Sequence, residues 1–114
     1  MSEIIENKIN IISEETVLEG KIVLDCLSRV HGTLEGEVIA KKGSELILAE
    51  TSIVRGNIHG DTVIVDGFVQ GDIEATTRVI ISSTGRVSGN IATPSLDVKF
   101  GAHFEGRANV LGNS

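Results

Sequence analysis

The feature that most constrains the fold is a five-residue unit, apolar–polar–Gly–polar–apolar, that occurs six times along the chain. Its copies read LEGKI at 18–22, LEGEV at 34–38, VRGNI at 54–58, VQGDI at 69–73, VSGNI at 87–91 and FEGRA at 104–108. Successive glycines are 15 to 20 residues apart. Such internal repetition is typical of folds in which each repeat stacks on the next one.

Within each unit, apolar and polar residues alternate with period two, which predicts a strand with one buried face. The residues two places before and two places after every glycine are apolar, and the residues next to every glycine are polar. We therefore expect the glycine to lie on the inward face with its apolar neighbours. There it would mark a bend, or a place where the interior has no room for a side chain.

A second strand signal lies between the glycine units. It reads LIL at 46–48, VIV at 63–65, VII at 79–81 and LDV at 96–98, and turn-like residues follow at 49–52, 66–67, 82–85 and 99–102. A repeat of this length is too short for a βαβ unit, which takes about 30 residues. Ile, Val and Thr together make 35 of the 114 residues, and β-branched side chains favour sheet. The pattern predicts an all-β, single-domain parallel β-helix, a solenoid of about six rungs.

Composition and charge exclude several classes of function. The net charge of −6 argues against nucleic acid as a partner, because a basic surface supplies most of that affinity. No apolar run is long enough for a membrane-spanning helix, and the first residues do not form a secretory signal. A single cysteine, Cys26, cannot form an internal disulfide, which fits a reducing cytoplasm.

The stretch GRVSGNIATPSLDVKFGAHFEG at 85–106, preceded by VDGFVQGDI at 65–73, resembles the bactofilins, bacterial cytoskeletal proteins that polymerise without a nucleotide. The resemblance covers about residues 17–111. It implies a right-handed β-helix of about six windings. It also implies end-to-end contacts between terminal rungs, in filaments that have no plus and minus end.

Two ends of the solenoid are therefore the candidate polymerisation interface. At the C-terminal end we expect Phe104 as the main contact, supported by Phe100, Val110 and Leu111. Phe104 replaces the usual Val or Leu of its column and Ala108 replaces the usual Ile, so a large aromatic side chain stands beside an emptied position. At the opposite end the candidates are Val17 and Leu18. The alternative left open is that Phe104 only fills the tapering end of the core.

Residues 1–16 lie outside the glycine repeat, and residues 112–114 form a short C-terminal tail after the β-helix domain at 17–111. Ile4, Ile5 and Ile9 are the candidate membrane contacts of the first segment. Its net acidic charge argues against a lipid-binding helix, which usually has a basic face. The alternatives are a flexible tail or a first strand that covers the N-terminal edge.

We identify no residues for catalysis, metal binding or cofactor binding. His31, His59 and His103 stand at different offsets from their nearest glycines, so they do not converge on one point as zinc requires. Cys26 stands among apolar neighbours, as a buried thiol does. Glycine pairs such as GTLEG resemble phosphate loops superficially, but no helix follows to bind a nucleotide phosphate.

The sequence thus favours a cytoplasmic scaffold, not an enzyme, whose main partner is a second copy of itself. Membrane or cell-wall-associated proteins are further candidate partners, and the polymer could lie peripherally at the inner membrane. Two alternatives remain open. One is a β-helix enzyme or metal-binding module of the hexapeptide-transferase or carbonic-anhydrase type, and the other is a monomeric adaptor.

Overall fold

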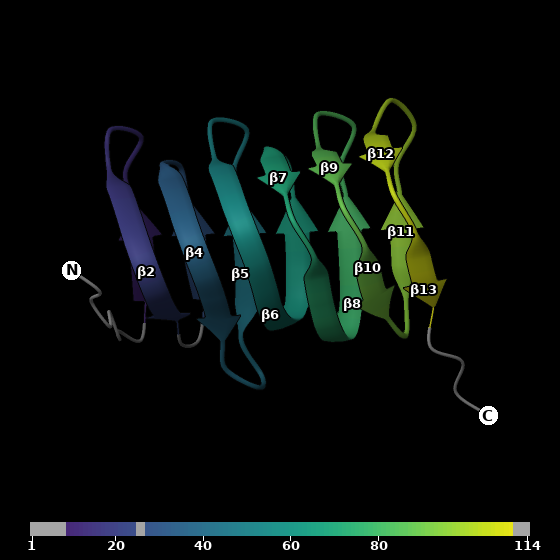
Figure 1. The fold of residues 1–114 in the computed structure, drawn as a ribbon, viewed down its shortest axis with the longest axis horizontal. Helices are drawn as coiled ribbons and strands as arrows, with labels where there is room; N and C mark the ends of the chain where they lie inside the picture. The colour runs from purple at the N-terminus through teal and green to yellow at the C-terminus, as the bar shows by residue number, and fades with distance from the viewer. Residues whose placement is uncertain (1–8, 25–26, 111–114) are drawn as a thin grey trace.

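The computed structural model describes residues 9–24 and 27–110. These residues form thirteen strands and no helix, and all their strand pairs are parallel. The strands wind into a β-solenoid of about five turns, seen from the side in Figure 1. The all-β parallel solenoid expected from the repeat is confirmed. The number of turns is slightly below the six rungs that we expected, because six glycines enclose only five repeat intervals.

Three stacks of strands run along the axis, and we name them faces A, B and C. Face A holds the residues before each repeat glycine, in β2 (Val17–Leu24), β4 (Thr33–Ala40), β6 (Ile53–Val65), β7 (Phe68–Gln70), β9 (Arg86–Ser88) and β12 (His103–Glu105). Face B holds the residues after it, in β2, β4 and β6 and then in β8 (Ile73–Ile81), β10 (Ile91–Thr93) and β13 (Ala108–Val110). Face C holds β1 (Ile9–Ile12), β3 (Leu27–Val30), β5 (Glu45–Leu48), the ends of β6 and β8, and β11 (Leu96–Val98).

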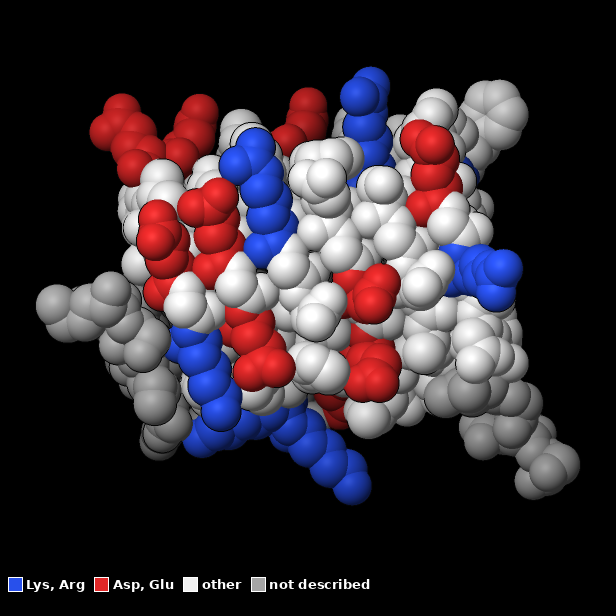
Figure 2. Space-filling model, viewed as in Figure 1, with Lys and Arg blue, Asp and Glu red and all other residues white. Residues whose placement is uncertain are grey.

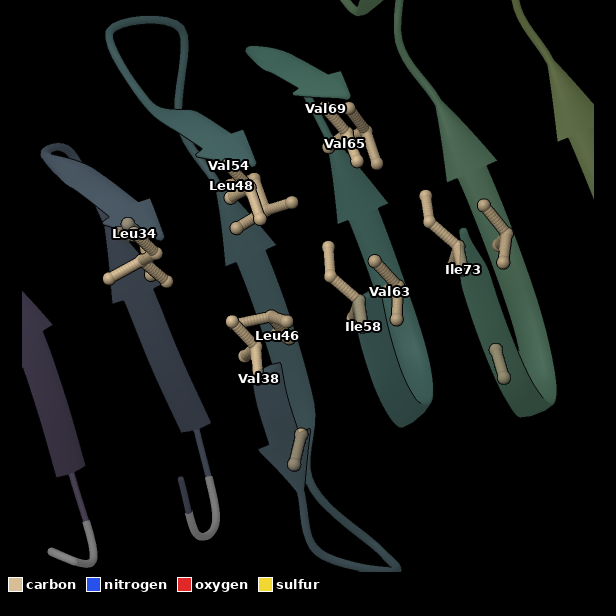
Figure 3. Close-up of a cluster of buried hydrophobic side chains, with 14 of the residues drawn as sticks. Leu34, Val38, Leu46, Leu48, Val54, Ile58, Val63, Val65, Val69 and Ile73 are labelled. Atoms are coloured by element: carbon tan, nitrogen blue, oxygen red, sulfur yellow. The ribbon is translucent and has the colours of Figure 1, made fainter. Parts of the chain in front are cut away.

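The core is built from stacked columns of like side chains. In-register pairing places Leu34 beside Val54 and Val54 beside Val69 on face A, and Val38 beside Ile58 on face B. These five side chains are fully buried, and Figure 3 shows such side chains pointing inward between the strands. The two apolar columns expected around the glycines are therefore confirmed over the inner rungs.

The terminal rungs depart from this pattern. Leu18 in the first rung and Phe104 in the last are half-buried and pack against the core, and Ala108 is exposed.

The second strand signal is confirmed as β5, the ends of β6 and β8, and β11. Along face C, Leu46, Val63 and Val79 continue the core in register.

The repeat glycines do not line the interior, contrary to our expectation. All six have positive φ, between 102° and 147°. A Cβ on Gly56 would lie 1.8 Å from the carbonyl oxygen of Gly36, and a Cβ on Gly71 would lie 1.9 Å from that of Gly56. The missing side chain would therefore point along the solenoid axis at the backbone of the previous rung, and Gly36 itself is exposed. The expected lack of room is real, but it lies at the corner between faces A and B.

A strand lies within the segment that we expected to be an N-terminal tail. β1 pairs with β3, with Ile12 beside Val30, and Ile12 is buried. β1 thus begins face C at the N-terminal edge, which is one of the alternatives that the sequence left open. Ile4 and Ile5 lie outside the described residues, and Ile9 is the first residue of β1.

Candidate functional site

The C-terminal end of the solenoid presents three strands with one free edge each. β11 pairs only with β8, β12 only with β9 and β13 only with β10 among the described residues. In Figure 1 these strands lie at the end of the solenoid that is opposite to β2. Since unpaired strand edges are templates for further strand pairing, this end is a candidate assembly surface.

The same end exposes side chains at positions that form the core one rung further in. Val98 is 44% exposed, whereas its register partner Ile81 is fully buried. Val110 is 53% exposed, and Phe104 is half-buried over Val87. Each of these side chains would bury more apolar surface if a further rung covered it.

Phe100 differs from the other candidates at this end. It is 100% exposed in the turn between β11 and β12, which is closed by a hydrogen bond from the Ala102 N–H to the Lys99 carbonyl oxygen, 3.0 Å. The structure thus brings Phe104, Phe100 and Val110 to one end, and Leu111 lies outside the described residues. Our prediction missed Val98, although LDV at 96–98 stands in the column of LIL, VIV and VII.

The N-terminal end is chemically different. Val17 is 58% exposed and Leu18 half-buried, but the inward residues of the same strand, Ile22 and Leu24, are buried. Exposed acidic residues also stand at this end: Glu14, Glu15 and Glu19. Figure 2 shows several acidic side chains over β2 and β4, and others over the middle of the same face and towards its C-terminal end. This end therefore offers less bare core and more negative charge than the C-terminal end.

A ladder of side-chain hydrogen bonds follows the glycine corner. The Oδ1 atom of Asn57 accepts from the Asp72 N–H at 3.4 Å, that of Asp72 from the Asn90 N–H at 3.1 Å, and that of Asn90 from the Arg107 N–H at 3.2 Å. Each residue directly follows a repeat glycine. Arg107 has no acceptor atom in its side chain, so it cannot extend the ladder to a further rung.

Asp61 joins three segments at the opposite edge of face B. Its carboxylate accepts hydrogen bonds from the Thr77 hydroxyl, from the Thr76 hydroxyl at 2.7 Å, and from the Gly43 N–H at 2.6 Å. These bonds, the one from Thr77 first, lower the pKa of Asp61 below its usual 3.8, and the charge of Lys42 adds to this. The site tethers the turn between β4 and β5 to strand β8, and we assign it a structural role.

The histidines do not gather into a metal site. His59 lies between two glutamates on neighbouring rungs, with Nδ1 3.0 Å from Glu74 and Nε2 3.9 Å from Glu37. No group of three or more His, Cys, Asp and Glu side chains that could hold a metal ion occurs within residues 9–24 and 27–110. Cys26 lies outside the described residues. The described part of the chain also has no helix that is long and apolar enough to cross a membrane.

A parallel β-solenoid whose terminal strands have free edges presents unpaired backbone groups at its ends, and such groups are templates for pairing with further strands. A family model described as "Bactofilin: Polymer-forming cytoskeletal" matches residues 10–109. The chain belongs to the bactofilin family, which is a structural and not an enzymatic family.

Two curated relatives come from Myxococcus xanthus (strain DK1622). The chain is 30% identical to Bactofilin BacP over 100 residues, which are 88% of this chain and 41% of BacP. It is 28% identical to Bactofilin BacO over 100 residues, which are 88% of this chain and 78% of BacO. The chain therefore spans about two fifths of the length of BacP and almost four fifths of BacO. No solved structure matches this chain.

Proposed function

We propose that this chain is a cytoskeletal scaffold that assembles end to end into filaments, which organise cell shape or localise partner proteins. The observation that carries the proposal is the exposure, at the C-terminal end, of positions that are core one rung further in. Val98, Phe104 and Val110 stand in register with buried residues, and the strands that carry them have free edges. Covering them with a second copy would bury apolar surface and pair backbone groups in one step.

The contrast between the two ends supports a joint between like ends. A C-terminal end that meets a second C-terminal end brings bare apolar surface against bare apolar surface. Against an N-terminal end it would meet Glu14, Glu15 and Glu19, beside inward residues that are already buried. A like-to-like contact is a two-fold, isologous contact. Filaments in which such joints alternate with joints between two N-terminal ends have no plus and minus end.

Assembly requires no nucleotide in this proposal. Phosphate-binding glycine loops use free backbone N–H groups, commonly at a helix N-terminus. Here the N–H of Gly71 donates to the Ser88 carbonyl oxygen at 2.9 Å, and the N–H of Gly89 donates to the Glu105 carbonyl oxygen at 2.8 Å. These glycine N–H groups hold successive rungs together, so they are not free to bind phosphate.

The filament acts in the cytoplasm in this proposal, and membrane or cell-wall-associated proteins are its further partners. Its main partner is a second copy of the same chain. Side chains on the outer surfaces of faces A and B stay accessible along an end-to-end filament, because the joint uses only the terminal rungs. Those surfaces are where such partners would bind.

The test is the variant Phe104→Arg, observed by negative-stain electron microscopy without nucleotide and with metals chelated. A like-to-like joint contains Phe104 twice. If each copy contributes about 2 kcal/mol of apolar burial, the loss weakens the joint by about three orders of magnitude. A buried arginine charge weakens it further. We expect folded, short or single particles where the unmodified chain forms filaments.

The matched control is Phe68→Arg. Phe68 is half-buried on the outer side of face A in an inner rung, so an arginine side chain there can extend into solvent. We expect this variant to form long filaments. Long filaments of Phe104→Arg, or discrete particles of the unmodified chain at every concentration, would contradict the proposal.

A further inference from the structure

An apolar stripe runs along the outer surface of face C. Ile47, Ile64 and Ile80 stand in register on three successive strands, and each is half-buried although it points away from the core. The same column continues to Arg29 at one end and to Asp97 at the other, and both of these are exposed. A positive charge thus precedes the three isoleucines and a negative charge follows them.

A second outward column, beside the first, has the opposite order of charge. Glu45, Thr62 and Arg78 are register neighbours on the same three strands. Glu45 and Arg78 are exposed, and Thr62 is half-buried between them. In each column, the two charged residues lie the same number of strands from β6, on opposite sides of it, and have opposite signs.

This arrangement is self-complementary under a two-fold axis that is parallel to β6 and lies over the outer surface of face C, midway between the two copies. Such an axis keeps each position along the strand and reverses the order of the rungs. Arg29 then faces Asp97 of the second copy, and Glu45 faces Arg78 of the second copy. Ile64 faces its own equivalent on the axis. We propose that face C is a lateral interface between two copies of this chain, packed side by side with their solenoid axes antiparallel.

The parallel arrangement is disfavoured by the same charges. A two-fold axis along the solenoid keeps the order of the rungs and reverses the position along the strand. With that axis over the isoleucine column, Arg29 would face Arg29 and Asp97 would face Asp97 of the second copy. Facing like charges are unfavourable and select against that orientation. The interface uses the side of the solenoid, so it does not depend on the end-to-end joint.

The charged groups at the ends of the stripe cannot satisfy each other within one chain. Arg29 and Asp97 stand four rungs apart, which is about 19 Å at the spacing of paired strands. Asp97 already pairs with Lys99 at 2.8 Å within the chain. A carboxylate has room for a second donor, so Arg29 of the second copy would join this pair and not replace it.

The first experiment is crosslinking with a short bis-maleimide in a Cys26→Ser background. Ile64→Cys places a thiol on the proposed axis, and packed sheets are about 10 Å apart, within reach of the reagent. The matched control is Ile39→Cys, because Ile39 is also half-buried and points outward, but from face B. We expect a covalent dimer from the first variant and not from the second. Equal yields from both, or none from Ile64→Cys, would overturn the proposal.

The second experiment exchanges charges and reads the same dimer yield. The Arg29–Asp97 contact occurs twice in the proposed dimer, and Arg29→Asp places a carboxylate opposite Asp97 in both. We expect this variant to raise the dissociation constant of the lateral dimer about tenfold. The combined variant Arg29→Asp with Asp97→Arg restores the attraction and should recover the yield. Because these two residues are too far apart to pair within one chain, recovery reports a contact between copies. No loss in the single variant, or no recovery in the double variant, refutes the antiparallel pairing.

The last comparison separates this interface from the end joint and from lipid. Crosslinking of Ile64→Cys that persists in the Phe104→Arg background supports the lateral contact even if filaments never form. Binding of the chain to phosphatidylglycerol vesicles that Ile64→Lys abolishes, without any crosslinked dimer, would assign the stripe to lipid and overturn the proposal.

Discussion

Gly71→Ala is expected to be among the most damaging single-methyl substitutions in an inner rung. Gly71 has φ of +145°, and a Cβ there would lie 1.9 Å from the carbonyl oxygen of Gly56. Gly43→Ala is a matched control, since Gly43 has φ of +84° but no atom within 4 Å of its Cβ position. The two variants add the same methyl group to a left-handed backbone, and only one of them drives it into a neighbouring rung.

The expected difference in the free energy of unfolding between the two variants comes from the contact of the added methyl group with the neighbouring rung. An L-residue held in such backbone conformations costs about 1–3 kcal/mol, and both variants carry this cost. In Gly71→Ala the rungs must also separate by more than an ångström, which weakens neighbouring hydrogen bonds worth about 1 kcal/mol each. We expect a loss of about 3–5 kcal/mol for Gly71→Ala and about 1–2 kcal/mol for Gly43→Ala. The larger loss is a substantial fraction of the 5–15 kcal/mol that is typical of whole domains.

The assay is urea unfolding followed by far-ultraviolet circular dichroism, because the chain has no Trp or Tyr for fluorescence. Midpoints are compared at a protein concentration where no filaments are present, so that assembly does not add to stability. Gly71→Ala should unfold at a clearly lower urea concentration than Gly43→Ala. If the two free energies of unfolding agree within about 0.5 kcal/mol, the glycine column is not a packing constraint and the reasoning fails.

Two further predictions concern charge. Asp61→Asn should lower the free energy of unfolding by about 1 kcal/mol at neutral pH, because an amide cannot accept all three hydrogen bonds. Since the pKa of Asp61 is lowered in the folded chain, the advantage of the unmodified chain is full above pH 3.8 and disappears as the pH falls through the lowered pKa, which urea titrations at several pH values measure. Removal of residues 1–8 should leave cosedimentation with anionic vesicles unchanged, because residues 1–16 are net acidic, and binding that the removal abolishes would instead reveal a lipid contact.

The repeat units could be placed from the sequence because burial along a parallel solenoid is a local property. Leu34, Val54 and Val69 each follow the same alternation, and in-register stacking then requires them to share a column. The core positions therefore follow from counting along the chain. The same reasoning fails at the terminal rungs, where Ala108 keeps its place in the column but nothing described covers it.

The direction of the glycines could not be predicted from alternation alone. Alternation indicates which face a side chain would take if φ were negative, and a glycine with positive φ is free of that rule. Gly36 therefore stands exposed at a corner, between buried Leu34 and Val38. Similarly, Val98 is exposed because no described strand follows β11 on face C, and alternation along the chain does not give the number of strands in a stack.

Because the rungs stack in register, the length of the subunit is set by its number of rungs. Every rung adds one strand spacing, about 4.8 Å, whatever the length of its corner turns. Duplication of one stretch of 15 to 20 residues between two repeat glycines would lengthen the subunit by one such step. It would leave both terminal rungs as they are. The axial period of a polymer joined at the ends would thus change in discrete steps, while the chemistry of its joints stays the same.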